Sequence, residues 1–213
     1  MKVQVALQKF NNIPFNHGAL LSLLQNYKSP NDKISRLLAE GTIIKIKKGL
    51  YVLSGNFRPA PVSKPLLANL IYGPSYVSLD FALSYHGLIP EGVFELCSMT
   101  PKRVKCYDTP LGRFTYTHSF ESFYGIGIMS ETNMDGTCFL IASPEKALCD
   151  KVVFTKNLSA RSVKAMRSFL SVDLRIDLQD LAGLDLSIIS QCCDSGHKAR
   201  HLNALYQVVE AEI

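Results

Sequence analysis

Apolar residues recur at helical spacing in three segments near the start of the chain. They predict a first helix from Val3 to Asn11, and a second over His17–Asn26 that the side chain of Asn16 caps. The second helix is expected to turn four leucines toward a core: Leu20, Leu21, Leu23 and Leu24.

The third segment carries the clearest helix signals. Ser29 is a cap residue, and Pro30 suits the first helical position, where a missing N–H costs nothing. Gly41 ends the helix. Its apolar stripe follows the spacing i, i+3, i+4 and consists of Ile34, Leu37 and Leu38. The opposite side of this helix is polar and is expected to face solvent.

After Gly41 the period of the pattern changes to two. Thr42–Lys47 and Leu50–Leu53 alternate around Lys48-Gly49, which predicts a β-hairpin. One face of the hairpin should be apolar and the other cationic, with Ile44 and Ile46 on the first and Lys45 and Lys47 on the second. A helix, a glycine and a hairpin in this order predict the second half of a winged helix-turn-helix.

The rest of the chain predicts a different architecture. Phe57–Pro65 holds three prolines and favours an extended linker. The fold class is therefore α+β: a winged helix-turn-helix over residues 1–55, then a mixed α/β C-terminal domain over residues 56–213 with a central sheet and a helical C-terminal region. The expected elements are helices at Lys64–Tyr72 and Leu79–His86 (capped by Ser78), strands at Val93–Met99, Val104–Tyr107, Arg113–His118, Tyr124–Ser130 and Cys138–Ala142, and helices at Pro144–Phe154, Ala160–Leu170 and three within Asp177–Glu212.

Positive charge is confined to the first quarter of the chain. Residues 1–55 carry eight Lys or Arg against two Asp or Glu, whereas residues 56–213 carry fifteen against sixteen. A local cationic face attracts the phosphates of double-stranded DNA through counterion release. The expected DNA-binding residues lie on the third helix and the hairpin: Lys28, Ser29, Asn31, Lys33, Ser35, Arg36, Lys45, Lys47 and Lys48.

These residues divide into two roles. The N-terminal half of the third helix should face the bases in the major groove, and Arg36 is the best candidate for a bidentate contact to guanine. The alternative is that Arg36 contacts phosphate only. The hairpin lysines should contact the DNA backbone and set affinity and salt dependence rather than sequence choice.

Composition narrows the class of protein further. An apolar fraction of 47% with 19% charged residues describes a folded chain with a substantial core. No apolar run reaches the roughly 18 residues of a membrane span, and the start carries no signal-peptide pattern. We therefore expect a cytoplasmic protein without a membrane partner. Its six cysteines form no CxxC pair and are expected to be reduced and buried.

No catalytic, metal or cofactor site is expected. Cys192-Cys193, His197 and His201 invite a zinc site, but Ser195-Gly196 interrupts the spacing. Gly125-Ile126-Gly127 lacks the spacing of a nucleotide loop and is expected to mark close strand packing. The carboxylates that a nuclease would need are scattered, and helix capping or solvation accounts for Asp173, Asp177, Asp180 and Asp185.

Three segments in order resemble the AbiEi family of antitoxins from abortive-infection systems. They are RLLAEGTIIKIKKGLYVL at the end of the basic region, YVSLDFALSYHGL, and ASPEKALCDKV within Ala142–Val153. The resemblance spans most of the chain and is weakest after about residue 155. Ser143-Pro144-Glu145 is explained as a helix start, so the third segment is expected to define the domain rather than to carry chemistry.

The resemblance implies a function. Family members combine an N-terminal winged helix that represses their own operon with a C-terminal domain that opposes a nucleotidyltransferase-like toxin. By this resemblance the chain is a DNA-binding transcriptional autorepressor and antitoxin, not an enzyme, and its partners are inverted repeats in its own promoter and the cognate toxin. Two alternatives stay open from the residues alone: a ligand-responsive winged-helix regulator without a toxin partner, and a DNA-targeted nuclease.

Overall fold

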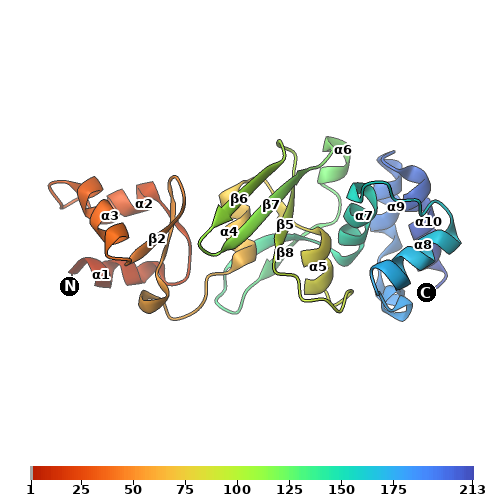
Figure 1. Ribbon diagram of the computed structural model, residues 1–213, viewed down its shortest axis with the longest axis horizontal. Coiled ribbons are helices and arrows are strands. Elements are labelled where there is room, and N and C mark those ends of the chain that lie inside the picture. The colour runs from red at the N-terminus through yellow and green to blue at the C-terminus, as the bar shows by residue number, and fades with distance from the viewer. Residues whose placement is uncertain (1) are drawn as a thin grey trace.

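The computed structural model describes residues 2–213, apart from the side chains of Lys2 and Gln4. The molecule is elongated, with the N-terminal helices at one end, a six-stranded sheet in the middle and a helical region at the other end (Figure 1). The two chain termini consequently lie at opposite ends of the long axis (Figure 1). The architecture is mixed α+β, as the sequence pattern predicts.

The N-terminal unit contains the three expected helices and the expected hairpin. The first two helices are shorter than predicted, and Asn16 caps the second, because its Oδ1 accepts a hydrogen bond from the Ala19 amide at 2.8 Å. Ser29 stands before the third helix, but its side chain makes no capping bond. The elements are α1 (Lys2–Leu7), the 3₁₀ turn η1 (Gln8–Phe10), β1 (Phe15–Asn16), α2 (His17–Leu23), α3 (Pro30–Ala39), β2 (Ile43–Lys47) and β3 (Leu50–Leu53).

Ile44 and Ile46 face the larger core together, as the sequence predicts, but the hairpin has no free cationic face opposite them, so that part of the prediction is wrong. β3 is the middle strand of an antiparallel sheet in the order β1-β3-β2, and all four of its residues are buried. Tyr51 and Leu53 pack into the core of the N-terminal helices, whereas Leu50 and Val52 pack into the core of the rest of the chain. Strand β3 is therefore covered on both faces, because a separate core lies on each side of it.

A short connection leads from β3 into the second unit. A 3₁₀ turn, η2 (Gly55–Phe57), precedes the stretch 58–63. This stretch has no regular secondary structure, in agreement with the linker predicted there. Val62 within it is buried in the larger core, and α4 (Lys64–Ile71) begins where the sequence predicts. The linker is thus packed against the second unit along part of its length.

The central sheet is mixed and has the strand order β6-β7-β5-β4-β9-β8. Two pairs are parallel, β5 with β7 and β4 with β9, and the other neighbours are antiparallel. Four of the five expected strands form. The fifth, expected at Tyr124–Ser130, starts later, because Tyr124 ends the helical turn α6 and the strand β8 begins at Ile128.

The elements of the sheet unit are β4 (Tyr76–Val77), α5 (Leu79–Tyr85), β5 (Leu96–Thr100), β6 (Lys105–Thr109), β7 (Gly112–His118), α6 (Glu121–Tyr124), β8 (Ile128–Thr132) and β9 (Cys138–Ala142).

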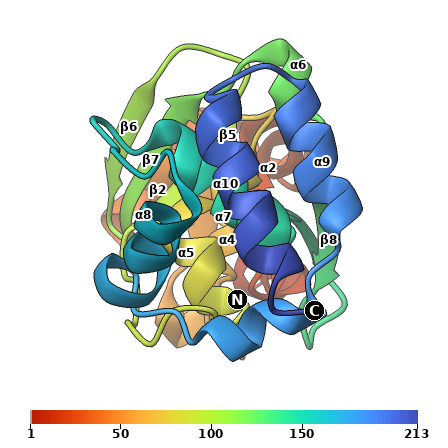
Figure 2. The same ribbon diagram turned by 90° about the vertical axis from the view of Figure 1, so that its right-hand side faces the viewer.

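The C-terminal region is helical, as predicted. Ser143 caps α7 by accepting a hydrogen bond from the Lys146 amide at 3.2 Å. Helix α10 packs on α7, α8 and α9, and Figure 2, which looks at this end of the molecule, shows α9 and α10 side by side. The elements are α7 (Pro144–Phe154), α8 (Val163–Ser168), a π-helical turn (Phe169–Asp173), a 3₁₀ helix (Leu178–Gly183), α9 (Leu186–Asp194) and α10 (Ala199–Glu210). Across residues 2–213, no helix is long and apolar enough to cross a membrane.

An ion pair lies at the centre of the larger core. Lys146 and Asp150 stand one turn apart on α7, both fully buried, with Nζ 3.1 Å from Oδ1. The Lys146 ammonium also donates to the Phe123 carbonyl at 2.7 Å and lies 3.2 Å from the centre of the Phe123 ring. These contacts attach α7 to the end of α6.

The carboxylate of Asp150 has further donors. Ser78 Oγ donates to Oδ2 at 2.5 Å, and the Tyr76 hydroxyl donates to the same oxygen at 3.1 Å. The expected Ser78 cap of α5 is therefore wrong, because its hydroxyl binds Asp150 instead. Burial raises the pKa of the Asp150 carboxyl, and the Lys146 ammonium and the donated hydrogen bonds act against that rise.

Gly127 lets the chain approach this helix closely. It has a φ of +62°, and a Cβ at this position would lie 2.8 Å from Cβ of Lys146 and 2.9 Å from Cγ2 of Ile188. Only glycine fits this contact without displacing its neighbours. Gly127 therefore marks a close approach, as expected for Gly125-Ile126-Gly127, but its neighbours are helices α7 and α9 rather than strands.

The six cysteines are all free, but their burial differs from the prediction. Cys149 and Cys192 are buried, whereas Cys106 and Cys138 are exposed on the two outer pairs of strands in the sheet. Burial raises the pKa of the Cys193 thiol to about 11. The exposed pair was missed because strand β6 is an edge strand and Cys138 lies at the start of β9.

Removing the charge of Asp150 should strongly destabilise the protein. We expect Asp150→Asn to lower the free energy of unfolding by about 3–5 kcal/mol, because the Lys146 ammonium then stays buried without its counter-charge. Asp80→Asn is the matched control, since Asp80 pairs with the next lysine of the same helix, Lys151, at the surface. That change should cost about 1 kcal/mol or less in urea unfolding. Equal losses in the two variants would contradict the role given to the buried pair.

Candidate nucleic-acid interface

Helix α3 presents a polar face to solvent. Ile34 and Leu37 are buried in the N-terminal core, and Leu38 packs against it from a half-buried position, as the spacing predicts. The residues of this segment that the sequence predicts as DNA-binding are accessible: Lys28, Ser29, Asn31, Ser35 and Arg36 are exposed, and Lys33 is half-buried. The structure therefore brings these six side chains onto one helix and the turn that precedes it.

The charges on this face are not neutralised by neighbours. Among residues 2–213, neither Lys28, Lys33 nor Arg36 takes part in a salt bridge, although the exposed carboxylates of Asp32 and Glu40 are near in sequence. The Ser35 hydroxyl donates to the Asn31 carbonyl at 3.1 Å, which leaves its oxygen free to accept. The exposed guanidinium of Arg36 and the exposed amide of Asn31 suit hydrogen bonding to a polar partner.

The three hairpin lysines do not share one environment. Lys45 and Lys48 are exposed, but the Lys47 ammonium donates a hydrogen bond to the Ile71 carbonyl at the end of α4. The difference arises from a β-bulge, because the register with β3 shifts between Lys45 and Lys47. Lys47 is therefore part of the contact between the two units, and the structure separates it from its two neighbours.

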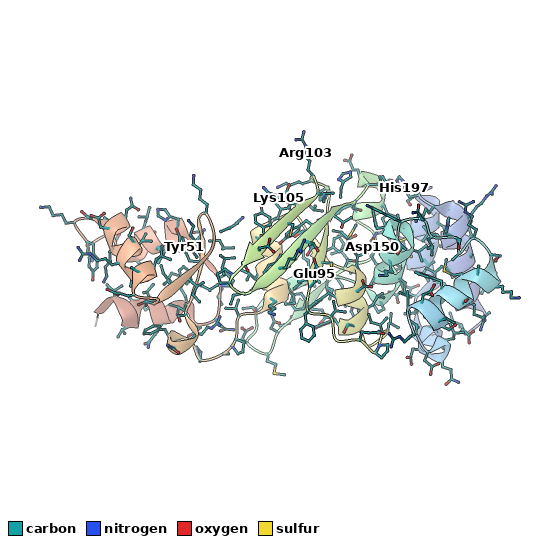
Figure 3. The ribbon with its side chains drawn as sticks, in the orientation of Figure 1. Tyr51, Glu95, Arg103, Lys105, Asp150 and His197 are labelled. Carbon is teal, nitrogen blue, oxygen red and sulfur yellow. The ribbon has the colours of Figure 1, made fainter. Side chains whose placement is uncertain are left out.

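A second group of cations lies on the sheet unit and was not predicted. Lys102 and Arg103 lie between β5 and β6, and Lys105 begins β6 (Figure 3). The ammonium groups of Lys102 and Lys105 lie 5.5 and 5.4 Å from the centre of the Tyr72 ring, one residue beyond the carbonyl that Lys47 binds. Residues 56–213 carry nearly equal numbers of positive and negative side chains, so their net charge does not reveal this group. In the sequence it shows only as three positive residues within positions 102–105.

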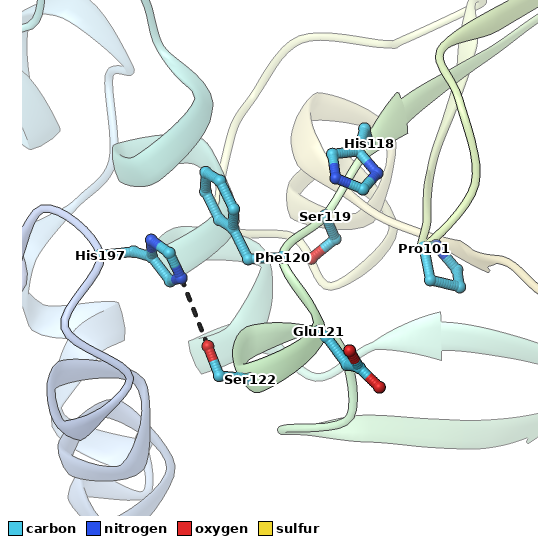
Figure 4. A pocket seen from close by; sticks show the side chains of 7 residues that line it. All are labelled: Pro101, His118, Ser119, Phe120, Glu121, Ser122 and His197. Carbon is cyan, nitrogen blue, oxygen red and sulfur yellow. Dashed lines mark hydrogen bonds between the residues drawn. The ribbon is translucent and has the colours of Figure 1, made fainter.

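A large cavity lies elsewhere, at the ends of two parallel strands. It has a volume of about 930 Å³, and Figure 4 shows the seven residues that line it: Pro101, His118, Ser119, Phe120, Glu121, Ser122 and His197. Pro101 follows β5, and the next five follow or end β7, so the cavity lies at the carboxyl ends of these strands. Crevices in this position bind ligands in many α/β proteins.

The residues of the zinc hypothesis are not brought together. His201 is buried and its Nε2 lies 3.0 Å from the Leu158 carbonyl, whereas His197 lines the cavity. Cys192 is buried beside Cys149 in the core. Within the described part of the chain, no three His, Cys, Asp or Glu side chains form a group that could hold a metal ion.

Two of the scattered carboxylates act as helix caps. Asp177 accepts from the Gln179 amide at 3.1 Å, and Asp185 accepts from the Ser187 amide at 2.8 Å. The hydrogen bonds from Ser187 lower the pKa of the Asp185 carboxyl. Capping thus accounts for these two residues, as the sequence pattern predicts.

Comparison with known proteins identifies a similar fold only. No family model and no curated protein matches the chain. The crystal structure of the RV2827C protein from Mycobacterium tuberculosis is similar over 97% of this chain and 80% of that one, with a TM-score of 0.53 and 14% sequence identity. At this identity the likeness concerns the arrangement of helices and strands, from the N-terminal unit to the C-terminal helices.

Proposed function

We propose that this protein is a DNA-binding transcriptional autorepressor and an antitoxin that opposes a nucleotidyltransferase-like toxin, as in AbiEi-type abortive-infection systems. The observation that carries the DNA-binding part is the exposed polar face of α3 and the turn before it, where Arg36 and Lys28 have no salt-bridge partner among the described residues. The three helices and the hairpin of the N-terminal unit then act as a winged helix-turn-helix.

In this proposal α3 is the recognition helix. Its ten residues span about 15 Å, and the major groove is wide enough to admit a helix. Asn31, Ser35 and Arg36 point away from the N-terminal core and would reach base edges, with Arg36 placed for guanine. Lys45 and Lys48 would contact phosphates on the flanking backbone. Lys47 contributes instead by joining the N-terminal unit to the second unit through Ile71.

The antitoxin part of the proposal rests on the resemblance of three segments. Two of them meet in the larger core: Tyr76 and Ser78 belong to YVSLDFALSYHGL, Lys146 and Asp150 belong to ASPEKALCDKV, and all four side chains form one buried network. Residues that lie far apart in the sequence therefore have a common structural task. This supports the interpretation of the two segments as the signature of one domain, whose outer surface is available to a partner.

The hairpin lysines should contribute unequally to DNA binding. We expect the double change Lys45→Glu, Lys48→Glu to weaken binding to every DNA sequence. The slope of log K against log salt should fall by about 1 for each phosphate that the variant no longer binds. Electrophoretic mobility assays on the DNA upstream of the gene, at several salt concentrations, measure both effects.

Lys47→Met is the matched control for this experiment. Its ammonium is already engaged by the Ile71 carbonyl, so the salt slope should stay at the wild-type value. Unaltered binding by the double variant would show that the hairpin does not contact DNA.

Arg36 should set sequence choice rather than general affinity. Arg36→Ala should weaken binding to the operator by about 1–3 kcal/mol while leaving binding to unrelated DNA nearly unchanged. Competition between operator and random-sequence duplexes separates the two quantities. If both affinities fall by the same factor, Arg36 contacts phosphate and not a base. Arg200→Ala offers a control, since Arg200 is exposed on α10 at the far end of the molecule.

The antitoxin role predicts a genetic result. Expression of a neighbouring gene for a nucleotidyltransferase-like protein should arrest growth, and co-expression of this chain should restore it. A variant with Arg36→Ala should still restore growth, because the proposed antitoxic surface belongs to the second unit. Failure of rescue by the wild-type chain would contradict the antitoxin role and favour a ligand-responsive regulator.

A further inference from the structure

The cavity at the ends of β5 and β7 has no part in the proposed DNA contacts. It is lined from the β5–β6 connection, the segment His118–Ser122 and His197 before α10. In Figure 3 His197 lies near the C-terminal helices, far along the molecule from Tyr51 in the hairpin. A volume of about 930 Å³ falls in the range of sites for small organic ligands.

The first feature of the lining is a set of aromatic planes. The rings of Phe120 and His197 stack with centres 3.7 Å apart and planes inclined by 9°. Phe154, which is not part of the lining, packs on Phe120, with its ring centre 5.9 Å from that of Phe120 and an angle of 20°. His197 is half-buried and lines the cavity, and because Phe120 covers one face of its ring, only the opposite face can take a ligand. Such a surface favours a planar ligand.

The second feature is a pair of hydrogen-bond acceptors. His118 Nδ1 lies 3.0 Å from the Lys102 carbonyl, and a carbonyl oxygen only accepts, so Nδ1 carries the proton. In the neutral ring Nε2 is then an acceptor. The exposed carboxylate of Glu121 is also an acceptor. The lining therefore matches a ligand that donates N–H groups.

The third feature is a buried hydroxyl with no partner. Ser119 is fully buried, and its backbone amide already donates to the Thr100 carbonyl at 2.8 Å. Its Oγ has no hydrogen-bond partner among the described residues, although it belongs to the lining of the cavity. In the view of Figure 4 the other lining side chains surround this hydroxyl. A buried polar atom without a partner is costly, and a ligand that bonds to it removes that cost.

Other ligand classes fit this lining less well. Among the described residues that line the cavity there is one carboxylate and neither a lysine nor an arginine. A phosphate would therefore have no Lys or Arg side chain to pair with. His118, Glu121 and His197 are not among any metal-holding group of the described residues. Ser122 Oγ lies 3.3 Å from His197 Nε2, but no carboxylate is hydrogen-bonded to Nδ1 of that ring within residues 2–213, as an orienting third group would be.

We propose that this cavity binds a planar nitrogen heterocycle of the purine type, as a free nucleoside or as an unpaired base of a single strand. The ring stacks on His197, its N–H groups donate to Glu121 and to His118 Nε2, and the Ser119 hydroxyl completes the contacts. This site is separate from α3 and the hairpin, so it does not depend on the proposed repressor function.

The test uses 2-aminopurine, whose fluorescence falls when the base stacks on an aromatic ring. The chain contains no tryptophan, so protein emission interferes little. The full chain is titrated with 2-aminopurine riboside in one arm and with a short single strand carrying one central 2-aminopurine in the other. Saturable quenching by the riboside supports a free nucleoside as the ligand, and quenching of the oligonucleotide alone supports an unpaired base.

Variants connect the signal to the cavity. Ser119→Ala should weaken binding by about fivefold through loss of one hydrogen bond, and His197→Ala by roughly tenfold or more through loss of stacking. Ser98→Ala is the matched control, because Ser98 Oγ is also buried and without a partner among the described residues but does not line the cavity; its affinity should equal wild type. Thermal melting shows whether each variant is folded. If His197→Ala does not fold, Glu121→Gln serves as the third variant, because Glu121 is exposed.

Two results would overturn the proposal. The first is the absence of saturable quenching in both arms with the wild-type chain. The second is quenching that Ser119→Ala, His197→Ala and Glu121→Gln leave unchanged, since the base would then bind elsewhere. DNA binding by α3 can succeed or fail in the mobility assay independently of either result.

Discussion

Lys146 and Asp150 lie one turn apart on α7, and water reaches neither side chain. Moving two charges out of water costs several kcal/mol per ion, and only good geometry with additional hydrogen bonds offsets that cost. Here the partners come from three other segments: Tyr76 in β4, Ser78 at the start of α5 and the Phe123 carbonyl in α6. The pair can be buried only when sheet, connecting helices and α7 are assembled together. Gly127 completes the arrangement by admitting its backbone against Lys146.

The hairpin gives the same kind of constraint to the N-terminal unit. Its middle strand sends Tyr51 and Leu53 into one core and Leu50 and Val52 into the other. A strand that is shared in this way fixes the orientation of α3 relative to the sheet unit, because neither core is complete without it. The bond from Lys47 to the Ile71 carbonyl adds a polar contact to the same junction. The proposed recognition helix is thus held by the second unit rather than suspended on a linker.

Local signals predicted the elements well where one segment carries the whole signal. Helices α4 and α7 begin at the predicted residues because a cap and a proline specify each start, and β9 has the predicted bounds. The misses have a common cause. Strands β1 and β4 are two residues long and have no period of their own, and the π-helical turn after α8 follows helical residues without a local break. Ser78 stands at the cap position in sequence, but its hydroxyl is turned toward Asp150, to which it donates, and accepts no hydrogen bond from the first turn of α5.

For function, the sequence alone determined which side of α3 is polar and exposed to solvent. The apolar stripe fixes which side of the helix is buried, so Arg36, with Ser35 beside it, faces solvent in any fold that buries Ile34 and Leu37. Only the tertiary structure decided that Lys47 is engaged while Lys45 and Lys48 are free, because a bulge and a distant carbonyl set the difference. It also decided the cavity, whose residues come from positions 101, 118–122 and 197. Amphipathic period is a property of neighbouring residues, whereas a site is made by segments that meet only when the chain is folded.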